Sequence, residues 1–288
     1  MLIYTKKIIF ALFSRQYRLF IYVLSNLIDK KHNTQEKART RNTGQRKNPN
    51  KNNRTNMYEN LLRLPYFQGM SKKELTAILD KVKLDFSRHQ DGEKILRQED
   101  KCDKFVILIQ GKLSAKHQTS NNPYTLSEEI EAPYAIEPYS LFGPETHYSR
   151  CYTSLGDSSL LSIDKSYFYS DLLRHSIFTM NFLNLISRRA QIQESLSWLD
   201  APSELEGQIA RFVAVRSETL SGSKRLKIKM EQLAQQLGAT RLNISRVLNK
   251  LQEEGLATLN RGEIHFHRFE ELIEKTWEFP TKKQHPQQ

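Results

Sequence analysis

The spacing of hydrophobic residues along the chain changes its period near residue 83 and again near residue 167. Between these points, short apolar runs alternate with Gly, Asp, Asn and Pro signals at Asp91-Gly92, Gln110-Gly111 and Asn121-Asn122-Pro123. Many short strands at this spacing are typical of a closed or two-sheet β domain. The pattern therefore predicts a jelly-roll (double-stranded β-helix) domain with strands in the runs 83–87, 93–97, 105–109, 113–117, 124–126, 151–155 and 160–163.

Two segments carry helix-start signals. Ser71-Lys72-Lys73-Glu74 has the spacing of a capping box, and Met70 and Leu75 are placed for a hydrophobic staple, so we expect a helix from Ser71 to about Lys81. Ser203-Glu204-Leu205-Glu206 repeats the spacing after the helix-breaking Asp200-Ala201-Pro202. A second capped helix is therefore predicted to begin there.

A long helix is predicted between these signals. Apolar residues recur at helical spacing from Tyr167 onward. Leu185, Ile192 and Leu199 lie seven apart, with Leu196 on the adjoining edge, which is the spacing of a seam that pairs with another helix. Such a seam either covers the β domain or joins two copies of the chain. Because the helix is long and lies between two apparent domains, we expect residues 176–200 to be a dimerisation helix.

Near the C-terminus the pattern predicts a helix-turn-helix. Leu233, Ala234 and Leu237 form one apolar face, Gly238 can take positive φ at the helix end, and Thr240 can cap the next helix. The second helix repeats apolar residues at Ile244, Val247, Leu248 and Leu251. It ends near Gly255, and the strand-turn-strand pattern that follows predicts a wing.

The outward face of this second helix carries side chains that suit DNA. Thr240, Arg241, Asn243, Ser245 and Arg246 face away from the apolar side. Arg can bond guanine in a bidentate way, Asn can bond adenine, and Thr or Ser can hold phosphate. Arg261 at the wing tip is expected to contact phosphate. The alternative is an ordinary helical hairpin with an exposed polar face.

Net charge supports DNA binding only locally. The formal charge of +12 arises almost wholly in residues 1–56, where thirteen Lys or Arg oppose Asp29 and Glu36. The rest of the chain is therefore close to neutral. Residues 224–268 hold nine bases and four acids, a modest basic footprint of the kind that a phosphate-contacting surface needs.

Residues 1–56 show no pattern of a folded core. Arg15 and Arg18 stand in the middle of the apolar stretch from Ile8 to Ile28, which opposes a membrane span, and no cleavage site follows it. Residues 30–56 are rich in Asn, Lys and Arg, which is typical of disorder. We expect a dispensable extension upstream of a true start at Met57, and no membrane partner.

The sequence offers little that suits catalysis. Cys102 and Cys151 are too few for a disulfide framework or a zinc ribbon and favour a reducing cytoplasm. His265 and His267 share a face of a wing strand, but no third ligand is near in sequence. A cupin-like metalloenzyme would need a His-x-His motif with a downstream Glu inside the β domain. Instead, the β domain has isolated histidines at His89, His117 and His147. We expect no enzyme activity, no metal and no cofactor.

Several motifs resemble the Crp/Fnr family of transcription regulators. Thr240-Arg-Leu-Asn-Ile-Ser-Arg246 is similar to the family's recognition helix, although Leu242 stands where many members have a Glu that reads cytosine. Leu64–Leu75 resembles the family's opening helix. Asp91–Ile95 and Cys102–Gly111 resemble two strand segments of its cyclic-nucleotide-binding-like domain. The resemblance implies a homodimeric regulator that binds double-stranded DNA, with RNA polymerase as a further candidate partner.

Pro138-Tyr-Ser-Leu-Phe-Gly143 is similar to the entrance of the family's phosphate-binding cassette, but the cassette departs from the pattern beyond it. Pro144 is inserted before Glu145, and Cys151 replaces a hydroxyl residue. Arg150 follows Glu145 by only five residues, which is shorter than the family's spacing. The resemblance therefore implies an effector pocket whose ligand is unidentified and is not expected to be a cyclic nucleotide. The residues expected to line this pocket are Phe142, Gly143, Glu145, Arg150 and Thr153.

We therefore expect an α+β protein whose N-terminal β domain senses an effector and whose C-terminal winged helix-turn-helix binds DNA. A cyclic-nucleotide-responsive binding module is the alternative, and a cupin-like metalloenzyme is a remote one. The expected divisions are an extension (1–56), the β domain (57–175), the dimerisation helix (176–200), the winged helix-turn-helix (201–275) and a flexible tail (276–288).

Overall fold

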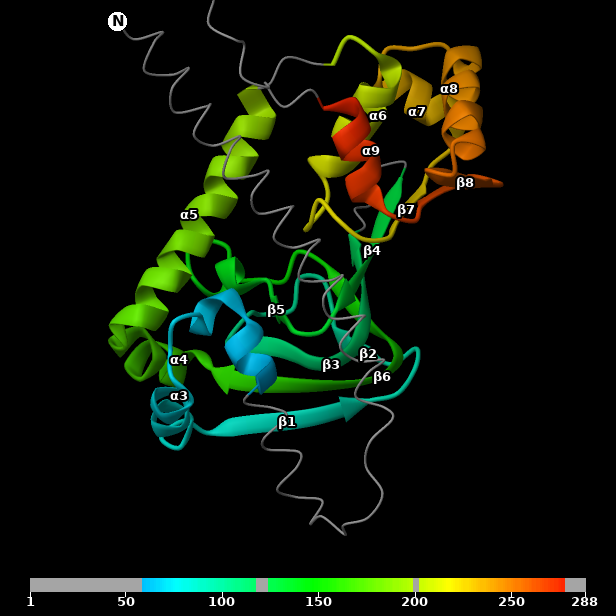
Figure 1. Ribbon diagram of the computed structural model, residues 1–288. Helices are drawn as coiled ribbons and strands as arrows, with labels where there is room; N and C mark the ends of the chain where they lie inside the picture. The colour runs from blue at the N-terminus through cyan, green and yellow to red at the C-terminus, as the bar shows by residue number, and fades with distance from the viewer. Residues whose placement is uncertain (1–58, 118–123, 199–201, 278–288) are drawn as a thin grey trace, which may run out of the picture. The chain divides into compact units, whose positions relative to one another are not determined.

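An antiparallel sheet of nine strands runs through the described residues, which are 59–117, 124–198 and 202–277 of the computed structural model (Figure 1). Its strands follow the order β1-β6-β3-β4-β7-β9-β8, while β2 pairs with β6 and β5 pairs with β3. The strands of the β domain are β1 (Leu84–His89), β2 (Lys94–Leu96), β3 (Lys104–His117), β4 (Thr125–Glu131), β5 (Tyr134–Ile136) and β6 (Cys151–Asp164). The predicted extension (1–56) lies outside the described residues.

Strands β3 and β6 form the centre of the β domain. Each continues for 14 residues where the sequence pattern predicted two separate strands. The predicted turn at Gln110-Gly111 is wrong, because β3 continues through it and only shifts its register against β6. Gly111 takes φ +91, which a side chain rarely adopts, so the glycine marks a bulge inside one strand.

The first predicted helix is confirmed. Helix α3 (Lys72–Leu79) follows Ser71, whose Oγ accepts from the Glu74 backbone N–H while the Glu74 side chain accepts from the Ser71 N–H. Met70 and Leu75 are both buried. The helix ends at Leu79, two residues before the expected Lys81. Short helical turns follow elsewhere as η1 (Pro65–Phe67), η2 (Pro138–Leu141), α4 (Lys165–Ser170) and η3 (Leu172–Arg174).

Aromatic side chains fill the core where these turns meet the sheet. Phe105 on β3 packs against Phe168 on α4 with ring centroids 4.9 Å apart, and Phe178 lies edge-on to both. Phe182 continues the cluster one helical turn further along. These contacts anchor the N-terminal half of the long helix to the β domain.

The predicted long helix is confirmed as α5 (Ser176–Trp198). Helix α6 (Leu205–Ala214) follows it, but the predicted second capping box is wrong. Glu204 is the N-cap residue and its side chain makes no capping bond. The Glu206 carboxylate instead accepts from Lys250 Nζ at 2.6 Å and lies 2.9 Å from Lys275 Nζ. Its side chain therefore pairs with two lysines later in the chain and does not cap α6.

The C-terminal elements complete the α+β fold that the sequence predicted. They are β7 (Lys224–Lys227), α7 (Met230–Gln236), α8 (Arg241–Glu253), β8 (Ala257–Asn260), β9 (Glu263–Phe266) and α9 (Phe269–Thr276). Strand β7, which the pattern did not predict, pairs with β4 on one side and β9 on the other. One sheet therefore joins the β domain to the wing. In the described part of the chain, no helix has the length and apolar character needed to cross a membrane.

Candidate functional site

Helices α7 and α8 form the predicted helix-turn-helix. Gly238 takes φ +62 between them, and Thr240 Oγ1 accepts from the Asn243 backbone N–H at 3.2 Å to cap α8. Leu233 on α7 and Ile244 on α8 are fully buried. These local signals specify where α7 ends and where α8 begins, because each satisfies backbone groups at a helix end.

The opposite side of α8 is exposed. Thr240, Arg241, Asn243 and Arg246 are exposed, and Ser245 is half-buried. Arg241 Nη1 lies 3.6 Å from Glu231 Oε1, and Arg246 Nη1 donates to Asn243 Oδ1 at 3.5 Å. Exposed pairs of this length contribute little, so both guanidinium groups are free to exchange them for another partner.

Leu242 belongs to the same exposed face, with 67 % of its surface accessible. It faces away from the core that Ile244, on the same turn of α8, enters. The sequence marks this position, because Leu242 stands where many Crp/Fnr members have a glutamate. Leu242 was nevertheless not among the outward-facing residues predicted from the sequence.

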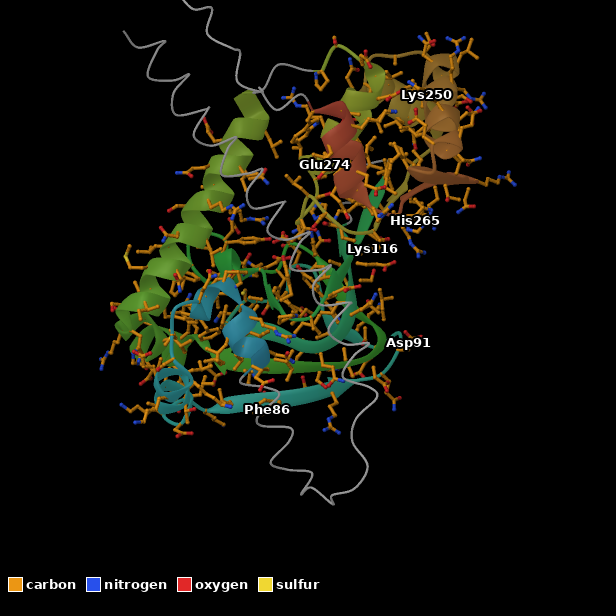
Figure 2. The ribbon with its side chains drawn as sticks, in the orientation of Figure 1. Phe86, Asp91, Lys116, Lys250, His265 and Glu274 are labelled. Carbon is orange, nitrogen blue, oxygen red and sulfur yellow. The ribbon has the colours of Figure 1, made fainter. Side chains whose placement is uncertain are left out.

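The wing is confirmed as β8 and β9, joined by an exposed turn at Arg261-Gly262, where Gly262 takes φ +74. His265, labelled in Figure 2, shares a hydrogen bond of 2.9 Å with Ser223 Oγ, and His267 shares one of 2.7 Å with Thr258 Oγ1. The pKa of His265 is lowered mainly by burial, and the nearby His267 and Arg225 lower it further. The described residues contain no group of three or more His, Cys, Asp or Glu placed to hold a metal ion.

The basic footprint of residues 224–268 is smaller than its sequence count. Lys224 is fully buried, and its Nζ donates to Glu128 Oε2 at 2.7 Å. Lys250 is bonded to Glu206, as described above. A count of basic residues in a sequence does not distinguish a buried lysine from an exposed one. Of the other seven bases, Arg241 and Arg246 lie on α8 and Arg261 at the wing tip, whereas Arg225 and Lys227 lie on β7.

The effector pocket predicted from the cassette does not come together as expected. Glu145 is 89 % exposed, whereas the Arg150 side chain is only 8 % exposed. Phe142 packs into the aromatic core, Gly143 takes φ +97 at an exposed turn, and Thr153 lies half-buried on β6. Glu145 and Arg150, the two charged groups expected to share a ligand, therefore lie in different environments.

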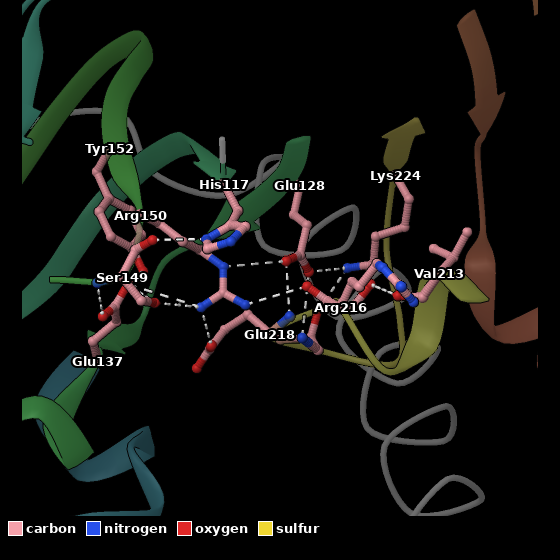
Figure 3. A network of polar contacts seen from close by, with 12 residues as sticks. His117, Glu128, Glu137, Ser149, Arg150, Tyr152, Val213, Arg216, Glu218 and Lys224 are labelled. Atoms are coloured by element: carbon pink, nitrogen blue, oxygen red, sulfur yellow. Dashed lines mark hydrogen bonds and ion pairs between the residues drawn. The ribbon is translucent and has the colours of Figure 1, made fainter. Parts of the chain in front are cut away.

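Arg150 is bound inside a polar network instead (Figure 3). Its Nη1 donates to Glu218 Oε2 at 2.8 Å. Arg189 on α5 donates to both oxygens of the same carboxylate, at 2.8 and 2.9 Å. Tyr134 and Tyr139 donate to it through their hydroxyl groups at 3.1 and 2.8 Å. Glu218 belongs to the segment between α6 and β7, so this one carboxylate joins residues far apart in the sequence.

A second buried carboxylate, that of Glu137, lies beside the network. It accepts from the Ser149 backbone N–H at 2.7 Å, from Ser149 Oγ at 3.0 Å and from the Tyr152 hydroxyl at 2.9 Å. Arg150 Nη1 is more distant, at 3.8 Å. Neither Glu137 nor Glu218 was predicted from the sequence, because nothing local to either residue marks a carboxylate whose partners come from other elements.

Electrostatics keep Glu218 charged despite its burial. Burial alone raises the pKa of this carboxyl group, but Arg189 and Arg150 outweigh it and the pKa falls below its usual value. Lys224 differs, because burial lowers its pKa and the nearby Glu128 offsets only part of that effect. The network therefore depends on its two guanidinium groups to hold an ionised carboxylate away from water.

Comparison with known proteins bears on the C-terminal part of the chain. Residues 207–275 match the family model of the Crp-like helix-turn-helix domain. No curated protein matches the chain.

Among solved structures, the chain is similar to the catabolite activator protein of Thermus thermophilus, with 20% identity, 74% of this chain and 98% of that chain covered, and a TM-score of 0.41. It is also similar to DNR of Pseudomonas aeruginosa, with 18% identity, 76% and 96% covered, and a TM-score of 0.36. A third is the c-di-GMP responsive regulator CLP of Xanthomonas campestris, with 18% identity, 64% and 94% covered, and a TM-score of 0.37.

The family match coincides with the helices, turn and wing described above. Residues 207–275 are therefore a Crp-like helix-turn-helix domain.

Proposed function

We propose that the protein regulates transcription by reading DNA with the first turns of α8. The observation that carries this proposal is the division of α8 into a buried face and an exposed one. Ile244 and Leu248 are buried, while Arg241, Asn243 and Arg246 are exposed. Side chains at the start of a recognition helix reach base edges in the major groove. Leu242 adds an apolar contact of the kind that a thymine methyl group accepts.

Arginine substitutions should separate base reading from phosphate contact. We expect Arg241→Ala or Arg246→Ala to cost roughly 1–3 kcal/mol of binding free energy and to relax the preference at one base position. Arg261→Ala at the wing tip should weaken binding to all sequences alike and reduce the salt slope by about one. Titration of matched and single-mismatch duplexes at several salt concentrations measures both effects.

Arg268 supplies the control for these variants. It is exposed and its guanidinium pairs with Glu271 in its own segment, outside α8 and the wing. Arg268→Ala should leave both base preference and salt slope unchanged. An Arg241→Ala protein with wild-type preference at every position would contradict base reading by this residue.

We also infer a homodimer that assembles along α5. The seam proposed from sequence spacing comprises Leu185, Ile192, Leu196 and Leu199. Leu185 and Ile192 are half-buried, which leaves part of each side chain open to a partner. Leu196 is buried within its own chain, and Leu199 lies outside the described residues. The proposal therefore rests on Leu185 and Ile192.

Charge placed on the seam should separate the two copies. We expect Ile192→Glu to convert the dimer into monomers and to weaken binding to a two-half-site duplex, measured by analytical ultracentrifugation and DNA titration. Met180→Glu is the control, because Met180 is exposed on α5 outside the proposed seam. A dimeric Ile192→Glu protein alongside a monomeric Met180→Glu protein would place the interface on the other face of the helix.

In this proposal the protein acts by binding and not by catalysis. RNA polymerase is the partner proposed in addition to DNA. The proposed effector is not a cyclic nucleotide, because Arg150, which the resemblance assigns to the cyclic phosphate, already bonds Glu218.

A further inference from the structure

The Glu218 carboxylate is surrounded by donors from four other segments. Arg150 directly precedes β6, Arg189 lies on α5, Tyr134 on β5 and Tyr139 on η2. All four donate to it within 3.1 Å, and the Glu218 side chain is only 3 % exposed. Glu218 itself belongs to the matched residues 207–275. A side chain of the DNA-binding domain therefore ends inside a site that the rest of the chain builds.

The geometry of this site is that of a receptor for a carboxylate. Arg189 offers both ends of its guanidinium to the two oxygens, the bidentate arrangement that suits a planar anion. The same guanidinium lies 3.9 Å from the centre of the Tyr139 ring, which fixes its plane. Arg150 and the two tyrosine hydroxyl groups complete the shell. Arg150 also donates to the Ser149 and Tyr139 hydroxyl groups, so its position does not depend on Glu218 alone.

The other two buried carboxylates nearby have partners of their own. Glu128 accepts from Lys224 Nζ at 2.7 Å and from the backbone N–H of Glu218 at 2.7 Å. Glu137 is held by Ser149 and Tyr152, as described above. Both lie farther from Arg150 than Glu218 does, at 3.7 and 3.8 Å against 2.8 Å. The two arginines therefore share the Glu218 carboxylate as their close counterion.

We propose that Arg150, Arg189, Tyr134 and Tyr139 form a carboxylate receptor whose resident ligand is Glu218, so that the DNA-binding domain is held by a ligand tethered within its own chain. The receptor takes small monocarboxylates as a chemical class, and Glu218 excludes them while it is bound. The receptor itself does not depend on the function proposed above. Its effect on DNA affinity rests on that function.

Chemical rescue tests the receptor directly. Glu218→Ala removes a methylene and a carboxylate, the same heavy atoms as acetate. We expect Glu218→Ala to lower the melting temperature by about 10 °C. Acetate at about 0.1 M should restore at least half of that loss, whereas chloride and acetamide at the same concentration should not. Equal recovery with chloride or acetamide would overturn the proposal, as would no recovery with acetate.

Glu218→Gln is the matched control. It removes the charge but keeps the volume, so the amide fills the space that acetate needs. Acetate should therefore leave the melting temperature of Glu218→Gln unchanged. A rise as large as that in Glu218→Ala would mean that acetate acts elsewhere, which would overturn the receptor.

A second measurement covers the case in which Glu218→Ala does not fold. Melting temperatures of Glu218→Gln, Arg189→Gln and the double variant give the coupling between the two side chains. We expect the double variant to melt close to the less stable single variant, because either change already breaks the bidentate pair. Additive losses would overturn the proposal.

DNA binding links the receptor to regulation. Glu218→Ala should bind a two-half-site duplex about tenfold more weakly than wild type. When one DNA-binding domain of the dimer is bound, a second domain that is held less firmly has a lower effective concentration at the other half-site. Binding to a single half-site should not change, and acetate should restore two-site binding relative to chloride at equal ionic strength. If wild type bound no DNA, the proposed function would fail while the melting experiments still decided the receptor. Unchanged two-site binding in Glu218→Ala would overturn the link.

Discussion

Replacing Arg150 by methionine is expected to lower the free energy of unfolding by about 3–5 kcal/mol, the usual loss when one partner of a buried ion pair is removed. The Arg150 side chain is 8 % exposed and its Nη1 donates to Glu218 at 2.8 Å. Glu128 and Glu137 lie within 3.8 Å of the same guanidinium. Methionine preserves most of the apolar stem but leaves three buried carboxylates with less positive charge beside them.

The matched control is Arg225→Met. Arg225 also pairs with a glutamate on β4, since its Nη2 lies 3.4 Å from Glu129 Oε1, but its side chain is 52% exposed. An exposed pair of this kind contributes about 0–1 kcal/mol. Urea denaturation followed by circular dichroism compares the two variants. Equal losses would contradict the view that Arg150 stabilises the fold through buried charge.

The second large effect is expected for Gly111→Ala. A Cβ built at Gly111 would lie 2.4 Å from the Asp157 carbonyl oxygen and 2.8 Å from the Ser158 Cα, both backbone atoms that cannot rotate away. The residue also takes φ +91, where a side chain is strained. Strain and overpacking together should lower the free energy of unfolding by about 2–5 kcal/mol.

Gly156→Ala isolates the steric part of that loss. Gly156 lies in β6, also with positive φ (+75), but a Cβ there meets nothing within 4 Å. Its loss should therefore be about 1–2 kcal/mol, from backbone strain alone. The same urea experiment measures both variants. A Gly111→Ala protein as stable as Gly156→Ala would show that β3 and β6 are not in close contact at the bulge.

The helix-turn-helix was predictable because its determinants are local. Thr240 caps a helix that begins at the next residue, Gly238 ends the preceding one, and Ile244 and Leu248 repeat at helical spacing. Each signal lies within a few residues of the structure that it specifies. The capping box at Ser71 was found for the same reason.

The sequence predicted a β domain, but it did not predict the course and pairing of every strand. Gly111 is a turn signal in an isolated sequence, yet pairing with β6 carries the strand through it as a bulge. Strand β7 is held by β4, which is about a hundred residues away, and no local pattern marks it. Likewise, Glu206 has the spacing of a capping box but bonds to lysines 44 and 69 residues later. Long-range partners override local preference in each case.

The polar network was the least predictable feature. The sequence singled out Arg150 for an effector pocket and paired it with Glu145, five residues away. In the structure its partner is Glu218, 68 residues away. Nothing in the residues around Glu218 indicates that its side chain is buried. A cassette arginine predicts that an anion is bound, but not that the anion belongs to the chain.

Selection of bound sequences from a random DNA pool tests the central claim most directly. We predict that the wild-type protein selects an inverted repeat whose half-site centres lie about one helical turn apart, roughly 10–10.5 bp, because a two-fold dimer presents α8 twice. The Arg241→Ala protein should select the same spacing with a relaxed preference at one base position in each half-site. A pool without any inverted repeat, or an Arg241→Ala selection identical to wild type, would contradict α8 as the DNA reader.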